Sequence, residues 1–216
     1  MRNIFDKQLV RLNNELIEMG SLVEQSIETA VEALVKQDVK KAKEAIRSDD
    51  KINHQEKEIE NLCLKLLLEQ QPVAKDLRLI SAVLKMITDL ERIGDHAADI
   101  SEITITLAEN PYVVDLKGIQ KMAKETMEMI IKSIEAFVNK DLEIANEVIR
   151  HDDVVDDLFK EIKKTVIKLI NENPEDGEQV ADILMIAKYF ERIGDHATNI
   201  AEWVIFSITG KHQNEN

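Results

Sequence analysis

The same seven residues, Glu-Arg-Ile-Gly-Asp-His-Ala, occur at positions 91–97 and again at 191–197. In each copy the glutamate and the aspartate are four positions apart, so their carboxylates lie on one face of any helix that contains them. In the first copy Asp99 continues the row that begins with Glu91 and Asp95. Like charges at this spacing destabilise a helix unless a positive charge lies among them. The spacing therefore indicates that each copy needs a cation.

Two kinds of cation can supply this charge, and the spacing alone does not choose between them. The first is an arginine, such as Arg92 or Arg192, because buried arginine–carboxylate networks often join helices. The second is a metal ion, since carboxylates suit Mg²⁺, Ca²⁺, Mn²⁺ or iron. His96 and His196 each follow an aspartate directly, which points them about 100° away from the carboxylate row. We expect these histidines at the surface or beside the site rather than among the ligands.

An oxidative di-iron enzyme is the catalytic alternative for carboxylates on helices. Sites of that class carry a histidine three positions after a glutamate, whereas Glu91 and Glu191 are followed there by Gly94 and Gly194. The sequence also lacks a Gly-rich phosphate loop, a nucleophile elbow and a Cys–His nucleophilic pair. We therefore predict no catalytic residues. A metal-dependent or metal-storing bundle with its own activity is the alternative function, and a helical scaffold with ion-paired acids is the third.

The composition is that of an acidic, helical protein. Of the 216 residues, 42 are acidic and 28 are basic, which gives a formal charge of −14. Because no lysine-rich patch stands out, nucleic acid is a poor partner. The single cysteine, Cys63, excludes an internal disulfide, and neither a signal peptide nor a long apolar segment is present. We therefore expect a cytoplasmic protein that does not insert into a membrane but can dock on its surface.

The heptapeptide is part of a longer internal repeat. Residues 19–47 align with residues 122–150 at an offset of 103, and the offset at the heptapeptide is 100. A tandem duplication with a three-residue loop deletion explains this change. Asn110-Pro111 separates the halves because proline interrupts a helix. We therefore predict two domains, 1–110 and 111–216.

Apolar residues at steps of three and four predict three long helices in each half. The first helix of each half ends before Asp38 or Asp141, and each aspartate caps the helix that follows. The second helices are expected at 39–69 and 142–171, and the third ones from Pro72 to Ala108 and from Pro174 to Ile208. Short connections make neighbouring helices antiparallel. The predicted fold is all-α, with two tandem three-helix bundles built from six long antiparallel helices.

Acidic residues also interrupt the apolar stripe of the second predicted helix in each half. Asp49 and Glu56 lie on this stripe in the first half, and Asp152 lies on it in the second. The flanking polar residues are Asp50 and Asn53, with Asp153 and Asp156 as their counterparts. Antiparallel packing brings these groups opposite the carboxylate rows. Gly94 and Gly194, unfavourable inside a helix, indicate that something packs close to the backbone there.

The chain resembles the PhoU family. The resemblance rests on segments 76–79, 90–95 and 190–195, on the polar segments 50–53 and 153–156, and on the tandem arrangement. It covers nearly the whole chain, and the doubled Glu-Arg-Ile-Gly-Asp motif is highly specific. It implies two three-helix bundles related by pseudo-twofold symmetry. It also implies metal binding at the repeated Glu-x-x-x-Asp motifs, with multinuclear iron or zinc clusters in some members.

Carried over to this sequence, the resemblance places metal ligands in both halves. The first site would use Glu91, Asp95 and Asp99, with Asp50 or Asn53 facing them. The second would use Glu191 and Asp195, with Asp153, Asp156 or Asp157 opposite and Asn199 in place of Asp99. Because an amide oxygen is a neutral and weaker ligand, we expect the second site to hold fewer ions or to hold them less tightly. Manganese, magnesium and calcium remain alternatives to iron and zinc.

The resemblance also implies a regulator rather than an enzyme. PhoU proteins restrain phosphate uptake and signalling by contacting the phosphate ABC transporter and, in many bacteria, a sensor histidine kinase. We therefore expect a cytoplasmic, metal-binding adaptor that negatively controls phosphate uptake and phosphate-starvation signalling. The long bundle faces are also able to support a homodimer.

Overall fold

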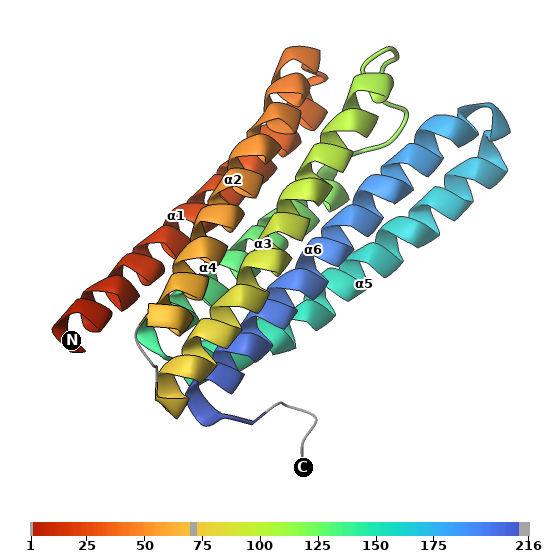
Figure 1. Ribbon diagram of the computed structural model, residues 1–216. Helices are drawn as coiled ribbons and strands as arrows, with labels where there is room; N and C mark the ends of the chain where they lie inside the picture. The colour runs from red at the N-terminus through yellow and green to blue at the C-terminus, as the bar shows by residue number, and fades with distance from the viewer. Residues whose placement is uncertain (1, 70–72, 212–216) are drawn as a thin grey trace.

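The computed structural model describes residues 2–69 and 73–211, and this part of the chain is helical without strands. The elements are α1 (Arg2–Lys36), α2 (Val39–Glu69), α3 (Ala74–Leu107), α4 (Lys117–Asn139), α5 (Leu142–Glu172), a short 3₁₀ turn (Pro174–Asp176) and α6 (Gly177–Thr209). The six long helices lie side by side along one axis (Figure 1). The predicted all-α fold of two three-helix sets is therefore confirmed. A membrane-spanning helix is not found within residues 2–69 and 73–211.

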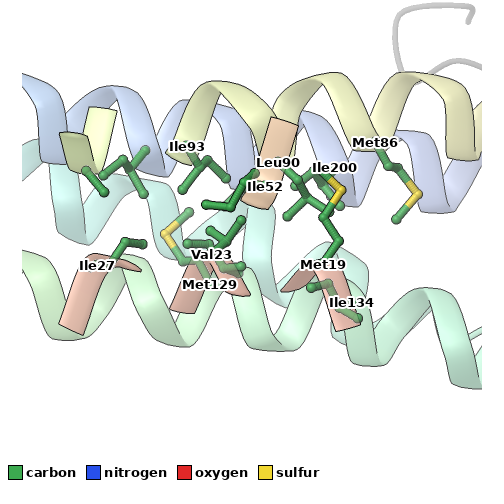
Figure 2. Packing of buried hydrophobic residues seen from close by; sticks show 14 of the residues in the cluster. Met19, Val23, Ile27, Ile52, Met86, Leu90, Ile93, Met129, Ile134 and Ile200 are labelled. Carbon is green, nitrogen blue, oxygen red and sulfur yellow. The ribbon is translucent and has the colours of Figure 1, made fainter. Parts of the chain in front are cut away.

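The two helices that carry the heptapeptides lie at the centre of the molecule. Helix α3 packs against α1 and α2, α6 packs against α4 and α5, and α3 and α6 pack along each other (Figure 1). One apolar cluster crosses both halves and includes Met19 of α1, Leu90 of α3, Met129 of α4 and Ile200 of α6 (Figure 2). The heptapeptides are therefore held between the second helix of their own half and the third helix of the other.

Both predicted aspartate caps are present. Asp38 Oδ1 accepts hydrogen bonds from the backbone N–H groups of Lys40 at 2.9 Å and Lys41 at 3.1 Å. Asp141 does the same at the start of α5, where the N–H of Glu143 donates at 2.8 Å. Such a bond satisfies a helix N–H that has no partner inside the helix. The caps fix where α2 and α5 begin.

The start of α6 differs from the expectation. Helix α6 begins at Gly177 rather than at Pro174, because residues 174–176 form a separate 3₁₀ turn. The expected start at Pro72 lies outside the described residues, and α3 is described from Ala74. The break at Asn110-Pro111 is confirmed, since α3 ends at Leu107 and α4 starts at Lys117. These ends do not alter the position of the heptapeptides.

Candidate metal centres

The two heptapeptide glycines allow the second helix of each half to approach closely. A Cβ added at Gly94 would lie 3.3 Å from Asp49 Oδ1 and 2.8 Å from Ile52 Cδ1. A Cβ added at Gly194 would lie 3.2 Å from Asp152 Oδ1. The sequence prediction of close packing at these glycines is confirmed, and the neighbouring group is a helix. The carboxylates of Asp49 and Asp152 therefore lie directly against the backbone of α3 and α6.

Acidic side chains crowd together between α2 and α3. Burial raises the pKa of Asp49, and the charge of Asp95 raises it further. Burial also raises the pKa of Glu91, again with a contribution from Asp95. The pKa of Glu56 is raised by burial first and by Glu60 second. These carboxylates repel one another where they are partly removed from water, and the nearby positive charges do not cancel this effect on their pKa values.

One oxygen in this cluster has no hydrogen bond. Asp49 Oδ2 accepts from Asn53 Nδ2 at 2.8 Å. Asp49 Oδ1 is buried, and none of the described residues donates to it. A buried carboxylate oxygen without a donor is costly, because it has lost water and gained nothing in return. This oxygen is therefore able to accept a bond from a positively charged ligand.

Arg92 supplies only part of the missing charge. Its Nη1 lies 3.3 Å from Asp95 Oδ2, and its Nε lies 3.7 Å from Glu91 Oε2. The arginine side chain is 58% exposed, and ion pairs in that setting contribute little to stability. The arginine therefore balances the outer edge of the carboxylate row and leaves the inner oxygen of Asp49 unpaired.

The equivalent cluster between α5 and α6 has a similar core. Asp152 takes the place of Asp49, and its pKa is raised to about 6 by burial first and by Asp195 second. Asp195 lies at the exposed rim, where partial desolvation and the charge of Glu191 raise its pKa. Unlike the first half, this cluster contains an amino group, because Lys188 Nζ forms an ion pair with Glu191. The second half thus carries its own cation.

The residues predicted to face the carboxylate rows lie in different environments. Asp50, Asp153 and Asp157 are exposed, whereas Asn53 and Asp156 are half-buried. The residues that lie against the glycines are Asp49 and Asp152. These two were visible in the sequence as acids on the apolar stripe, but they were not placed in the ligand set. Their position on the apolar stripe predicts this contact with the glycines.

Positions 99 and 199 contribute to a polar cluster between the halves. Asn199 Nδ2 donates to Asp89 Oδ1 at 3.2 Å, and His196 Nδ1 lies 2.8 Å from the same oxygen. Asp99 Oδ2 lies 3.4 Å from His96 Nδ1. In both halves, therefore, this position has a partner other than the Glu-x-x-x-Asp pair.

The two histidines lie between α3 and α6. Their ring centres are 5.6 Å apart, and the ring of His96 lies 5.3 Å from that of Tyr189. The His96 side chain is only 12% exposed, and burial lowers its pKa. A surface position, one of the two expected, is thus excluded for His96. The histidines serve as contacts between the halves, beside the acidic clusters.

The carboxylates between α2 and α3 are suitable ligands for a hard cation, but their oxygens do not point to a common centre. Across residues 2–69 and 73–211, no three histidine, cysteine, aspartate or glutamate side chains are arranged to hold a metal ion. Carboxylate oxygens are nevertheless the ligands that such ions prefer, and the unpaired oxygen of Asp49 is available. Binding there would require the side chains of Glu91 and Asp95 to turn towards Asp49.

Comparison with known proteins gives matches over nearly the whole chain. The family model described as PhoU domain matches residues 16–104 and again residues 119–204. A phosphate-specific transport system accessory protein PhoU homolog from Clostridium acetobutylicum is 42% identical over 211 residues, which cover 97% of this chain and 96% of that protein. A similarly named protein from Thermotoga maritima is 34% identical, and the match covers 98% of this chain and 91% of that protein.

Solved structures agree with these sequence matches. The crystal structure of PhoU from Pseudomonas aeruginosa superimposes with a TM-score of 0.91 at 34% identity, covering 96% of this chain and all of that chain (100%). The phosphate transport system regulatory protein PhoU from Streptococcus pneumoniae has a TM-score of 0.89 at 28% identity, covering 97% of this chain and 99% of that chain. The similarity therefore includes both halves and their relative arrangement.

Proposed function

This chain belongs to the PhoU family, and we propose that it is an accessory regulator of phosphate transport. The observation that carries the proposal is the match of the family model to both halves, together with relatives of nearly equal extent that are named as accessory proteins of the phosphate-specific transport system. In this role the protein negatively controls phosphate uptake and phosphate-starvation signalling. It does so in the cytoplasm by contacting the phosphate ABC transporter and a sensor histidine kinase.

Metal binding is the second part of the proposal. In the first half Asp49, Glu91 and Asp95 would hold the ion, and Glu56 would supply a further carboxylate. The unpaired Asp49 Oδ1 and the raised pKa values of Asp49 and Glu91 support this choice. Asn53 holds the other oxygen of Asp49 and so orients its carboxylate. Asp99 lies one turn further along α3, beside His96.

A bound ion would supply positive charge where α2 and α3 otherwise repel each other. The ligands come from two neighbouring helices, so their shared ion joins α2 to α3 and fixes the shape of the outer face of the bundle. This is a role in presenting a surface to a partner and requires no chemical step. It fits a regulator rather than an enzyme.

A deletion strain and a pull-down test the regulatory role together. We expect the tagged full-length chain to co-purify with the phosphate transporter and the sensor kinase from membranes of cells grown in excess phosphate. We also expect the deletion strain to express its phosphate-starvation genes under that condition. An Asp49→Asn, Glu91→Gln, Asp95→Asn triple variant tests the proposed metal binding. It should lose the bound metal, whereas the control variant, with the exposed Asp50→Asn change, should keep it. Absence of both partners from the pull-down, combined with normal repression in the deletion strain, would refute the proposal.

A further inference from the structure

The two acidic clusters differ in charge at several equivalent positions, and two of these changes bring a lysine and an aromatic ring together. Phe159 of α5 takes the place of Glu56 of α2, and Lys188 of α6 takes the place of Thr88 of α3. The equivalence follows from the glycine contacts, since Asp49 meets Gly94 as Asp152 meets Gly194.

The number of acids does not explain this difference. Asp156 takes the place of Asn53, which offsets the replacement of Glu56 by Phe159. Asp156 also lies 4.0 Å from the exposed Lys160 Nζ. Of these changes, Lys188 is the one that places a cation against the Glu-x-x-x-Asp row of the second cluster.

Lys188 is held in place by contacts on two helices. Its ammonium forms an ion pair with Glu191, one turn further along α6. The same ammonium lies 5.4 Å from the centre of the Phe159 ring on α5. An aromatic face attracts a cation at this distance. The aromatic residue and the lysine therefore act as a pair, in which the ring positions the ammonium at the carboxylate row.

The first half has the opposite arrangement. Thr88 is neutral, and its Oγ1 donates to the carbonyl of Leu84 at 3.3 Å. Glu56 places a half-buried carboxylate where the second half has the aromatic ring. The charge balance of the first cluster therefore depends on Arg92 at its exposed edge.

We infer that Lys188, positioned by Phe159, is a built-in counter-ion that replaces metal in the second half, so that this chain binds metal preferentially in the first half. The inference rests on the proposed metal binding. It also attributes the weaker metal binding expected in the second half to Lys188 rather than to Asn199. Asn199 donates to Asp89 across the two halves, whereas Lys188 engages Glu191 directly.

Metal content of the purified full-length chain tests this inference. The protein is stripped with a chelator, dialysed against Mn²⁺ or Zn²⁺, and analysed for metal per chain by mass spectrometry. Relative to the wild type, we expect the Asp49→Asn variant to lose the bound metal and the Asp152→Asn variant to keep it. Lys188→Thr and Lys188→Met should each open the second half and raise the metal content about twofold. The reciprocal Thr88→Lys should lower it.

Two controls separate a local effect from a general one. Lys168→Thr removes the same charge from α5 at an exposed ion pair with Glu172, and should leave the metal content unchanged. Lys188→Met keeps an apolar chain against Phe159, and circular dichroism checks the fold of every variant. Equal loss of metal in Asp49→Asn and Asp152→Asn, with no gain in either Lys188 variant, would overturn the inference alone. Absence of metal from every variant would overturn the inference together with the proposed metal binding.

Discussion

His196 Nδ1 lies 2.8 Å from Asp89 Oδ1, and the two residues belong to opposite halves of the chain. The equivalent pair in the duplicated arrangement is His96 and Tyr189, whose rings lie 5.3 Å apart. One polar contact and one ring contact thus occupy positions that the duplication makes equivalent. The contact between the halves is therefore asymmetric.

The contact between His196 and Asp89 should contribute measurably to stability because the aspartate side chain is only 14% exposed. A double-mutant cycle of Asp89→Ala and His196→Ala, measured by urea unfolding near pH 6, should give a coupling free energy of about 1 kcal/mol. A matched cycle of Asp50→Ala with His196→Ala should give a value near zero, since Asp50 is exposed on α2. Equal coupling in the two cycles would contradict a direct contact.

The close approach at Gly94 predicts a specific cost for adding one methyl group. Alanine favours a helix over glycine by about 1 kcal/mol, but its Cβ at this position would lie 2.8 Å from Ile52 Cδ1. We expect Gly94→Ala to destabilise the protein by about 1–3 kcal/mol in urea unfolding. Gly177→Ala is the control, because no described atom beyond its chain neighbours and the nearby backbone of its own helix lies within 4 Å of the added Cβ. A Gly94→Ala protein as stable as the control would show that α2 moves away from the added methyl group at little cost in free energy.

The raised pKa of Asp152 predicts how stability depends on pH. This carboxyl titrates at about 6 in the folded chain against an ordinary value of 3.8, so the folded state holds the proton more tightly. Its contribution to stability is fully present below about pH 4 and is lost as the pH rises through about 6. Without metal, Asp152→Asn should therefore lose less stability than the wild type between pH 4 and pH 7. Parallel curves for the two proteins in urea unfolding would refute this assignment.

Added metal should stabilise the chain through the first cluster. A ligand at one hundred times its dissociation constant stabilises the folded state by about 2.7 kcal/mol. We expect Mn²⁺ or Zn²⁺ to raise the melting temperature of the chelator-treated wild type and of the Asp50→Asn control. The Asp49→Asn, Glu91→Gln, Asp95→Asn variant should not respond. An equal rise in all three proteins would place the bound ion elsewhere.

The sequence was sufficient for the helices because their apolar period is long and regular. The caps at Asp38 and Asp141 and the break at Pro111 mark the helix ends in the same way. The rotation of α2 was harder to predict. Asp49 and Asp50 differ by about 100° around the helix, and the choice between them depends on how Ile52 packs against Gly94.

The position of the histidines between the two halves was also not predictable from the apolar pattern of one helix. Helix α3 is buried on more than one side, because it contacts α1 and α2 as well as α6. The apolar stripe of α3 predicts the face that packs against α1 and α2. It gives no information about the face of α3 that packs against α6. His96 and Asp89 lie on that second side, and their partners His196 and Tyr189 are about a hundred residues away in the sequence.

The most direct test of the metal centre is anomalous diffraction from crystals of the chain grown with Mn²⁺. The expected result is an anomalous peak bonded to Asp49 Oδ1 and to the carboxylates of Glu91 and Asp95, with a weaker peak or none between Asp152 and Glu191. A well-ordered map without a peak at Asp49, or one in which Arg92 has moved inward to bind that oxygen, would contradict the proposed site.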